Sequence, residues 1–146
     1  MFSKRFLVVI LGFLVFFAFG FSNYSSAQTT PKVSVKANKK SYNPGTSGVL
    51  TITFKTGSGV KIPKEPPIDI NISGDGITGN GIQDYSGDGD GDYLSSNKVK
   101  YNFSVSDGAS DGSITISGTV KFGYCSSESG VCKIGNQKFS IKIKVQ

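Results

Sequence analysis

The sequence predicts an all-β protein with an immunoglobulin-like β-sandwich of about seven antiparallel strands. Three observations predict it. Apolar residues alternate with polar ones along six short runs, the runs are rich in β-branched residues, and turn-forming residues separate them. No segment shows the apolar period of a helix. The sequence contains no Trp, so the Cys, Trp and Cys framework of antibody domains is absent and the prediction concerns the sandwich alone.

The chain opens with a segment that has the features of a secretory signal peptide, residues 1–27. Lys4 and Arg5 form a basic start, residues 6–21 are uncharged and mostly apolar, and Ser25–Ala27 supply the small residues of a cleavage site. The alternative is an uncleaved membrane anchor, although a spanning helix needs about 20 apolar residues. We therefore expect a periplasmic or secreted protein, which would touch the membrane only through an uncleaved leader.

The predicted domain is residues 28–146. The strands expected in it lie, in chain order, at 33–35, 50–54, 68–72, 99–105, 114–122 and 139–145. Asn43-Pro44-Gly45 predicts a turn between the first two strands. The three prolines at positions 63–67 exclude a central strand and predict an extended edge or corner before the third. The Asp-Gly pairs within 107–112 predict a hairpin connection between the fourth and the fifth.

Three lysines alternate along the outward side of the last predicted strand: Lys138, Lys142 and Lys144. Charges in this position are typical of a solvated strand face, or of an edge that discourages pairing with another sheet. The alternative is a docking patch for an acidic partner.

Between the third and the fourth predicted strands the alternation stops. The segment 73–96 is rich in Gly and Asp, and we expect a long loop without a strand. Loops longer than about 12–15 residues in compact domains are usually functional or disordered. Tyr85, Tyr93 and Leu94 are apolar side chains within this polar segment, and we expect them to cover another part of the molecule.

The same loop contains a pattern that resembles a calcium site, Asp88-Gly-Asp90-Gly-Asp92. An EF-hand would need Gly where Tyr93 stands and Glu where Val99 stands, so this site class is excluded. A looser calcium site remains an alternative to a solvated loop. Its candidate ligands are Asp84, Asp88, Asp90 and Asp92.

The composition excludes several functions. The sequence contains no His, which rules out Ser-His-Asp and Cys-His nucleophiles and His metal ligands. Two cysteines are too few for a four-coordinate structural zinc site. Lys and Arg outnumber Asp and Glu by 16 to 10, but they form no basic cluster with interleaved aromatics, so nucleic-acid binding is not expected. No Gly-rich phosphate loop opens a helix, and no nicotinamide or flavin cofactor is expected.

The two cysteines, Cys125 and Cys132, lie between the last two predicted strands with six residues between them. In an exported chain such a pair is expected to form a disulfide. As a staple it is weak, since closing about eight residues is worth about 2.5 kcal/mol, against about 4.3 for a link across about 60 residues. The Ser, Gly and Glu residues between them leave the sulfurs accessible, and Lys133 next to Cys132 favours a thiolate. The residues alone leave both a redox-active and a structural disulfide open.

The segment from Gly118-Thr-Val-Lys-Phe-Gly-Tyr-Cys125 through Gly130-Val-Cys132 to Phe139–Val145 resembles the N-terminal periplasmic domain of the DsbD thiol-disulfide interchange proteins. The resemblance covers most of residues 32–145. It implies an immunoglobulin-like fold with redox cysteines on the last hairpin, where a loop covers them until a partner arrives. It also implies that Cys132 forms the mixed disulfide and that Cys125 resolves it. Tyr85, Tyr93 or Leu94 would be the covering side chains.

Together these observations predict a free-standing, exported thiol-disulfide interchange domain, a protein oxidoreductase without a cofactor of its own. Its partners would be periplasmic thioredoxin-like or disulfide isomerase proteins and a separate membrane thiol reductase. The alternative is a non-enzymatic β-sandwich binding or structural module with a purely structural hairpin disulfide. A third possibility is a calcium-stabilised surface domain built on the aspartate loop.

Overall fold

The computed structural model describes residues 29–83 and 91–146, so the predicted leader lies outside the described residues. The described chain forms strands β1 Lys32–Ala37, β2 Ser41–Tyr42, β3 Ser47–Lys55, β4 Val60–Lys61, β5 Asp69–Ser73, β6 Ile77–Ile82, β7 Lys98–Val105, β8 Gly112–Ser126 and β9 Cys132–Val145. Seven of them have five or more residues, in agreement with the predicted number, and β2 and β4 are two-residue pieces. No helix able to cross a membrane occurs in this described part.

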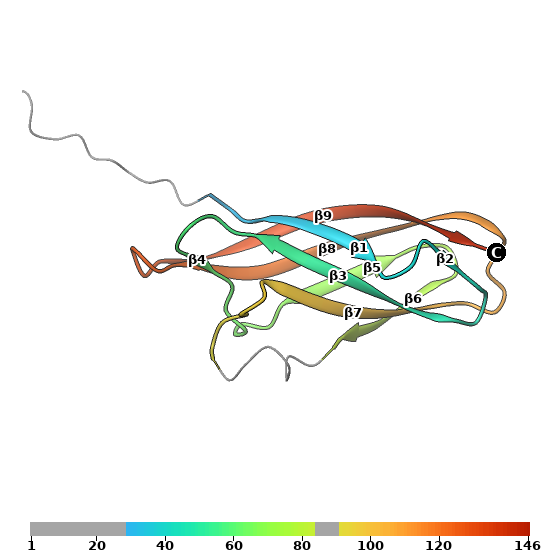
Figure 1. The fold of residues 1–146 in the computed structure, drawn as a ribbon, viewed down its shortest axis with the longest axis horizontal. Helices are drawn as coiled ribbons and strands as arrows, with labels where there is room; N and C mark the ends of the chain where they lie inside the picture. Colours follow the sequence, from blue (N-terminus) through green and yellow to red (C-terminus); the bar gives the residue numbers. More distant parts are fainter. Residues whose placement is uncertain (1–28, 84–90) are drawn as a thin grey trace, which may run out of the picture.

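The strands form two sheets that pack face to face as an immunoglobulin-like β-sandwich, which confirms the predicted fold class (Figure 1). One sheet has the order β1-β3-β7-β6, and the other has the order β2-β9-β8-β4, with β5 also pairing with β8. All pairs are antiparallel except β2 with β9. The hairpin predicted between β7 and β8 is wrong, because these strands belong to different sheets. The Asp-Gly pairs mark a reversal of the chain, but they do not specify which strand the chain joins next.

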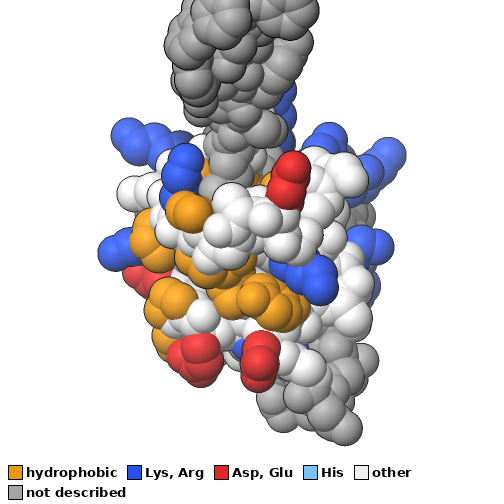
Figure 2. All heavy atoms as spheres, turned by 90° about the vertical axis from the view of Figure 1, so that its left-hand side faces the viewer, with side chains coloured by type: hydrophobic (Ala, Val, Ile, Leu, Met, Phe, Trp, Pro, Cys, Tyr) orange, Lys and Arg blue, Asp and Glu red, His pale blue; other side chains and the backbone are white. Residues whose placement is uncertain are grey.

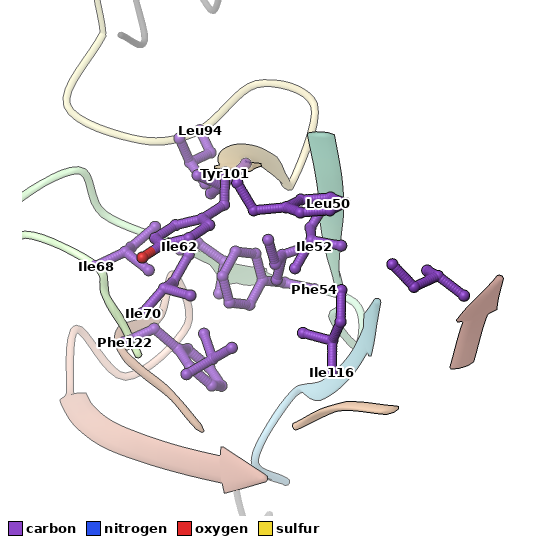
Figure 3. Packing of buried hydrophobic residues seen from close by; sticks show 14 of the residues in the cluster. Leu50, Ile52, Phe54, Ile62, Ile68, Ile70, Leu94, Tyr101, Ile116 and Phe122 are labelled. Carbon is purple, nitrogen blue, oxygen red and sulfur yellow. The ribbon is translucent and has the colours of Figure 1, made fainter. Parts of the chain in front are cut away.

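The core lies between the sheets and consists of the inward residues of the predicted alternation. Leu50, Ile52 and Phe54 of β3 are at most 2% exposed, and the Phe54 ring centroid lies 4.8 Å from that of Phe122 on β8. Figure 3 shows these side chains meeting between the two layers. On β9 the inward residues are less completely buried than on β3, since Phe139 is only partly buried.

The segment 73–96, predicted to be a loop without a strand, contains β6, which pairs with β7. The alternation does not reveal it because the middle of β6 is exposed and a β-bulge shifts its register at Gly81, where φ is 98°. Two residues before the bulge, Gly79 leaves room for Tyr101 of β7, because a Cβ at Gly79 would meet the Tyr101 hydroxyl. An edge strand exposed on one face needs few apolar residues, which explains why its sequence resembles a loop.

The predicted turn and the predicted proline corner are both present. Asn43 and Thr46 close a turn through a backbone hydrogen bond of 3.2 Å, with Gly45 at φ 76°, as a type II turn requires. After β4, Pro63 forms an isolated bridge with Tyr93, and the Glu65-Pro66 peptide bond is cis. This corner lies against β8, where a Cβ at Gly123 would be 3.1 Å from the Pro63 ring.

Candidate functional site

The β8–β9 hairpin positions the two cysteines opposite each other at its closed end. Cys125 and Cys132 are direct cross-strand partners, their Cα atoms are 4.0 Å apart, and they form a disulfide. One residue further, the Ser126 N–H donates a hydrogen bond of 3.0 Å to the Val131 carbonyl. Gly130, at φ 67°, allows the chain to reverse, and its N–H bonds the Ser126 carbonyl at 2.9 Å. The predicted disulfide is therefore present, and it lies just before a tight turn.

The turn is tied to the neighbouring connection before β4. The Ser127 N–H and the Ser127 hydroxyl both donate to the Gly59 carbonyl, at 2.7 and 2.9 Å. These two bonds hold the tip of the hairpin beside β4, at the end of the molecule that lies to the left in Figure 1.

The disulfide lies on the outer face of the five-stranded sheet. Lys61 of β4 pairs with Cys125, so Lys61, Cys125 and Cys132 form one row across three strands and share a face. Cys125, in the middle of the row, is 7% exposed, whereas Cys132 on the outer strand is exposed. On the inner face below, Tyr124 is 3% exposed, and its hydroxyl is 3.0 Å from the Thr30 hydroxyl.

An apolar surface flanks the disulfide in the next row. Ile134 of β9 pairs with Gly123 and is 57% exposed. A Cβ at Gly123 would lie 3.1 Å from the Pro63 ring, so the glycine lets Pro63 cover this position. Pro63 pairs in turn with Tyr93, which is 39% exposed. Figure 2 shows hydrophobic side chains gathered on this end of the molecule, with charged side chains around them.

The residues predicted to cover the cysteines have different positions. Tyr93 lies on the outer face, and the Lys61 ammonium is 5.4 Å from its ring centroid, within the range of a cation–π contact. Leu94 is 4% exposed and belongs to the core, and its N–H bonds the Ile62 carbonyl at 2.8 Å. Tyr85 lies outside the described residues. Among the three, Tyr93 is thus the one that the structure describes next to the disulfide row.

The calcium candidates are only partly described. Asp84, Asp88 and Asp90 lie outside the described residues, and the Asp92 carbonyl accepts a hydrogen bond of 2.8 Å from the Lys64 N–H. Among residues 29–83 and 91–146, no three acidic or cysteine side chains come together as a metal site would require.

The cations near the cysteines differ from the sequence-based expectation. Lys133, adjacent to Cys132, pairs with Tyr124 and so projects to the opposite face from the disulfide. Lys61 shares the face of the disulfide instead, and nothing in the sequence near either cysteine could have indicated it. Ile134 could have been found, because it is out of phase with the inward residues of β9. Lys138, Lys142 and Lys144 are exposed on the outer face, as predicted.

Comparisons with known proteins show a likeness at the level of architecture. No family model matches the chain, and no curated protein matches it either. Among solved structures, the chain is similar to a cohesin module from a family 33 glycoside hydrolase of Clostridium perfringens, at 12% identity and a TM-score of 0.46. The match covers 80% of this chain and 97% of that one. Nothing about function follows from this likeness.

Proposed function

We propose that this protein is an exported thiol-disulfide interchange domain that passes reducing equivalents to the disulfides of partner proteins. The observation that carries the proposal is the unequal placement of the two sulfurs. Cys132 is exposed on β9, at a position where no described strand pairs with the outer side of β9, whereas Cys125 is 7% exposed between β4 and β9. An interchange protein needs one accessible sulfur for its partner and a second, sheltered sulfur directly beside it. The proposed likeness to the DsbD N-terminal domain assigns the same roles.

The exchange takes place in two steps. In the reduced protein, the Cys132 thiolate attacks one sulfur of the partner's disulfide, forms a mixed disulfide and releases the other partner sulfur as a thiolate, which takes up a proton. The Cys125 thiolate then attacks the Cys132 sulfur, which re-forms the Cys125–Cys132 bond and releases the second partner thiol. Two electrons have moved from this chain to the partner.

The oxidised protein must be reduced again. The dithiol of a separate membrane thiol reductase would supply the two electrons by the reverse exchange, so the chain needs no cofactor of its own. Partners that receive the electrons would be periplasmic thioredoxin-like or disulfide isomerase proteins. Lys61, on the face of the disulfide, would favour the thiolate that each step requires.

A trapping experiment tests the proposal. In the reduced Cys125→Ser variant the mixed disulfide on Cys132 cannot be resolved, so covalent partners should accumulate when the variant is mixed with an oxidised envelope extract. Cys132→Ser is the matched control, and it should capture far less, because Cys125 is almost inaccessible. Equal capture by the two variants would contradict the assigned roles, and no capture by either would contradict the function.

The competing function is a non-enzymatic module with a structural disulfide, and the reduction potential separates the two. Structural disulfides of secreted proteins lie below about −300 mV, whereas exchanging pairs lie above this value. We expect the potential of the Cys125–Cys132 pair, measured in glutathione or dithiothreitol buffers, to lie above it. A lower value would favour the structural module.

A further inference from the structure

We propose that the free edge of β9 is the docking site for an extended, acidic segment of the partner protein, which pairs with it as an added strand. The segment would present its own cysteine to Cys132. We use the name β9 edge for the backbone groups of Cys132, Ile134, Asn136, Lys138, Ser140 and Lys142. The sulfur step rests on the proposed function, whereas the strand pairing rests on the backbone of β9 alone.

The hydrogen-bond pattern defines which backbone groups are available. The Ser126 N–H donates to the Val131 carbonyl, and the β8–β9 register has no shift. The backbone N–H and C=O groups of the odd-numbered residues of β9 therefore form the hydrogen bonds to β8. The backbone N–H and C=O groups of the even-numbered residues point away from β8. The hydrogen bond of 2.9 Å from the Lys144 N–H to the Lys40 carbonyl agrees with this. β2 pairs with β9 only at residues 144 and 145. Over residues 132–142, no strand in the described parts of the chain pairs with the β9 edge.

The nearby N-terminal segment contacts β9 through a side chain and not through this edge. The Gln137 carbonyl oxygen accepts a hydrogen bond of 2.9 Å from the Val33 N–H, and the Gln137 amide donates to the Pro31 carbonyl. Gln137 pairs with the buried Val120 and so belongs to the inner face of the sheet. The outward N–H and C=O groups of the β9 edge remain suited to a further strand, which is how extended peptides commonly add to a sheet.

The side chains along the edge indicate what the added strand carries. Ile134 is 57% exposed and offers an apolar contact beside the disulfide. Further along the same face are the exposed Lys138, Lys142 and Lys144, and the edge itself contains no acidic residue. A second copy of β9 would place lysines against lysines, which is unfavourable. An acidic segment complements them, so the occupant is a partner protein and not another copy of this chain.

The added strand would also place the reacting sulfurs in order. Lys61, Cys125 and Cys132 occupy one row across the sheet, and a cysteine of the added strand opposite Cys132 would extend this row by one strand. The N–H and C=O of Cys132 point to the added strand, so an antiparallel neighbour opposite it forms a hydrogen-bonded pair with Cα atoms about 5.5 Å apart, within the roughly 4.4–6.8 Å that disulfides span. Cys125 and the partner cysteine then lie on opposite sides of Cys132. Thiol-disulfide exchange needs this arrangement, because the attacking and leaving sulfurs lie on opposite sides of the central one.

The test uses a short synthetic peptide of alternating Glu and Val with Ser in the cysteine position, added to the oxidised, ¹⁵N-labelled protein. We expect the amide signals of Ile134, Asn136 and Lys138 to shift, and their hydrogen exchange to slow, while odd-numbered amides of β9 stay unchanged. The same peptide with alternate N-methylated backbone groups should bind at least about tenfold more weakly, because the methyl groups remove N–H donors that would bond the β9 edge. No change at the even-numbered amides, or equal binding of both peptides, would overturn the proposal.

A proline in the edge provides an independent check. Asn136→Pro removes an outward N–H without touching the pairing of β9 with β8, and should weaken binding of the peptide, whereas Asn136→Ala keeps the N–H and should bind as the wild type. If the proline variant does not fold, the two peptides on the wild-type protein still decide the question. A dimer through β9, seen by sedimentation, would also overturn the proposal.

Exchange with bis(2-hydroxyethyl) disulfide separates this proposal from the proposed function, because that reagent has no strand to pair. Rapid exchange without selective peptide binding would refute the docking site alone. Peptide binding without exchange would refute the interchange function and leave the docking site standing.

Discussion

At the scale of single residues, the two cysteines differ because of the strands on either side of them. Cys125 lies between β4 and β9, while Cys132 has a strand of the described chain on one side only. Two glycines near the cysteines lie where another ring occupies the space of a side chain. Gly123 admits Pro63 on the outer face, and Gly135 lies beneath the Phe122 ring on the inner face. A side chain at either position would disturb the support of the disulfide row.

Gly135→Ala is expected to destabilise the protein by about 1–3 kcal/mol, because the added methyl overpacks the core. The new Cβ would lie 2.8 Å from Cζ of Phe122, a ring that is 1% exposed. Gly57→Ala is the matched control, since no atom lies within 4 Å of a Cβ there. Urea unfolding of both variants measures the difference, and equal midpoints would contradict the assigned packing.

Tyr42 is expected to make the stability fall at alkaline pH. Its hydroxyl donates a bond of 2.7 Å to the Asn38 side chain and accepts one of 3.1 Å from the Lys39 N–H. Burial raises the pKa of Tyr42 above 10.0, and the Lys39 bond opposes this in part. Since the unfolded chain loses this proton at lower pH than the folded one, the contribution is complete below about pH 10 and is lost as the pH rises through the folded pKa.

The comparison that isolates this residue is the pH dependence of urea unfolding for the wild type and for Tyr42→Phe. The variant should lose less stability than the wild type above about pH 10, even if it is less stable at neutral pH because it lacks the hydroxyl. Parallel curves for the two proteins would show that Tyr42 does not carry the effect.

At the scale of elements, the β8–β9 hairpin is the longest unit of the fold, and the disulfide contributes little to holding it together. The two strands pair continuously from Gly112 with Val145 to Cys125 with Cys132, and the turn is closed by its own hydrogen bonds. A covalent link at this point joins residues that the ladder has already brought together. We therefore expect the bond to add little constraint beyond that of the ladder.

Replacing both cysteines by Ala is expected to cost at most about 2.5 kcal/mol, the entropic value of closing a loop of about eight residues. The free energy of unfolding of the double variant, compared with that of the oxidised wild type, measures this. Wild-type protein in a reducing buffer should give a similar value. A loss well above this limit would identify the bond as a main structural support and would favour the competing structural module.

At the scale of the whole molecule, the end that carries the disulfide is assembled from segments far apart in the sequence. The corner after β4, the segment at Tyr93 and the β8–β9 turn meet at one end of the sandwich, and the C-terminus lies at the other (Figure 1). The Thr30 hydroxyl, close to the start of the described chain, forms a hydrogen bond with the Tyr124 hydroxyl at the same end as the disulfide. The chain therefore enters the domain beside the disulfide.

We propose that the leader is removed on export. Intact mass measurement of the protein recovered from the periplasmic or culture fraction should then give a chain that starts at Gln28. Recovery of the full-length chain from the membrane fraction would instead support the uncleaved anchor. The same fractionation distinguishes both outcomes. A variant with bulky residues at Ser25–Ala27 cannot be cleaved there and serves as the reference for the uncleaved form.

The sequence alone was sufficient for the all-β class, the inward residues of β3, β7 and β8, the turn at Gly45 and the proline corner. These features depend on local alternation, on residues that favour φ above zero, and on the missing N–H of proline, all of which act within a few positions. The same local signals failed for β6, whose exposed middle and bulge carry no alternation, and for the β7–β8 connection, where a reversal does not specify the partner strand.

Only the tertiary structure decided which face and which neighbours each candidate residue has. It separated Leu94, in the core, from Tyr93, on the surface, and it placed Lys61 rather than Lys133 on the face of the disulfide. It also left β9 with one unpaired edge over residues 132–142 of the described chain. The physical reason is that strand order and register are set by burial of the whole apolar surface, in which residues far apart in the sequence take part together.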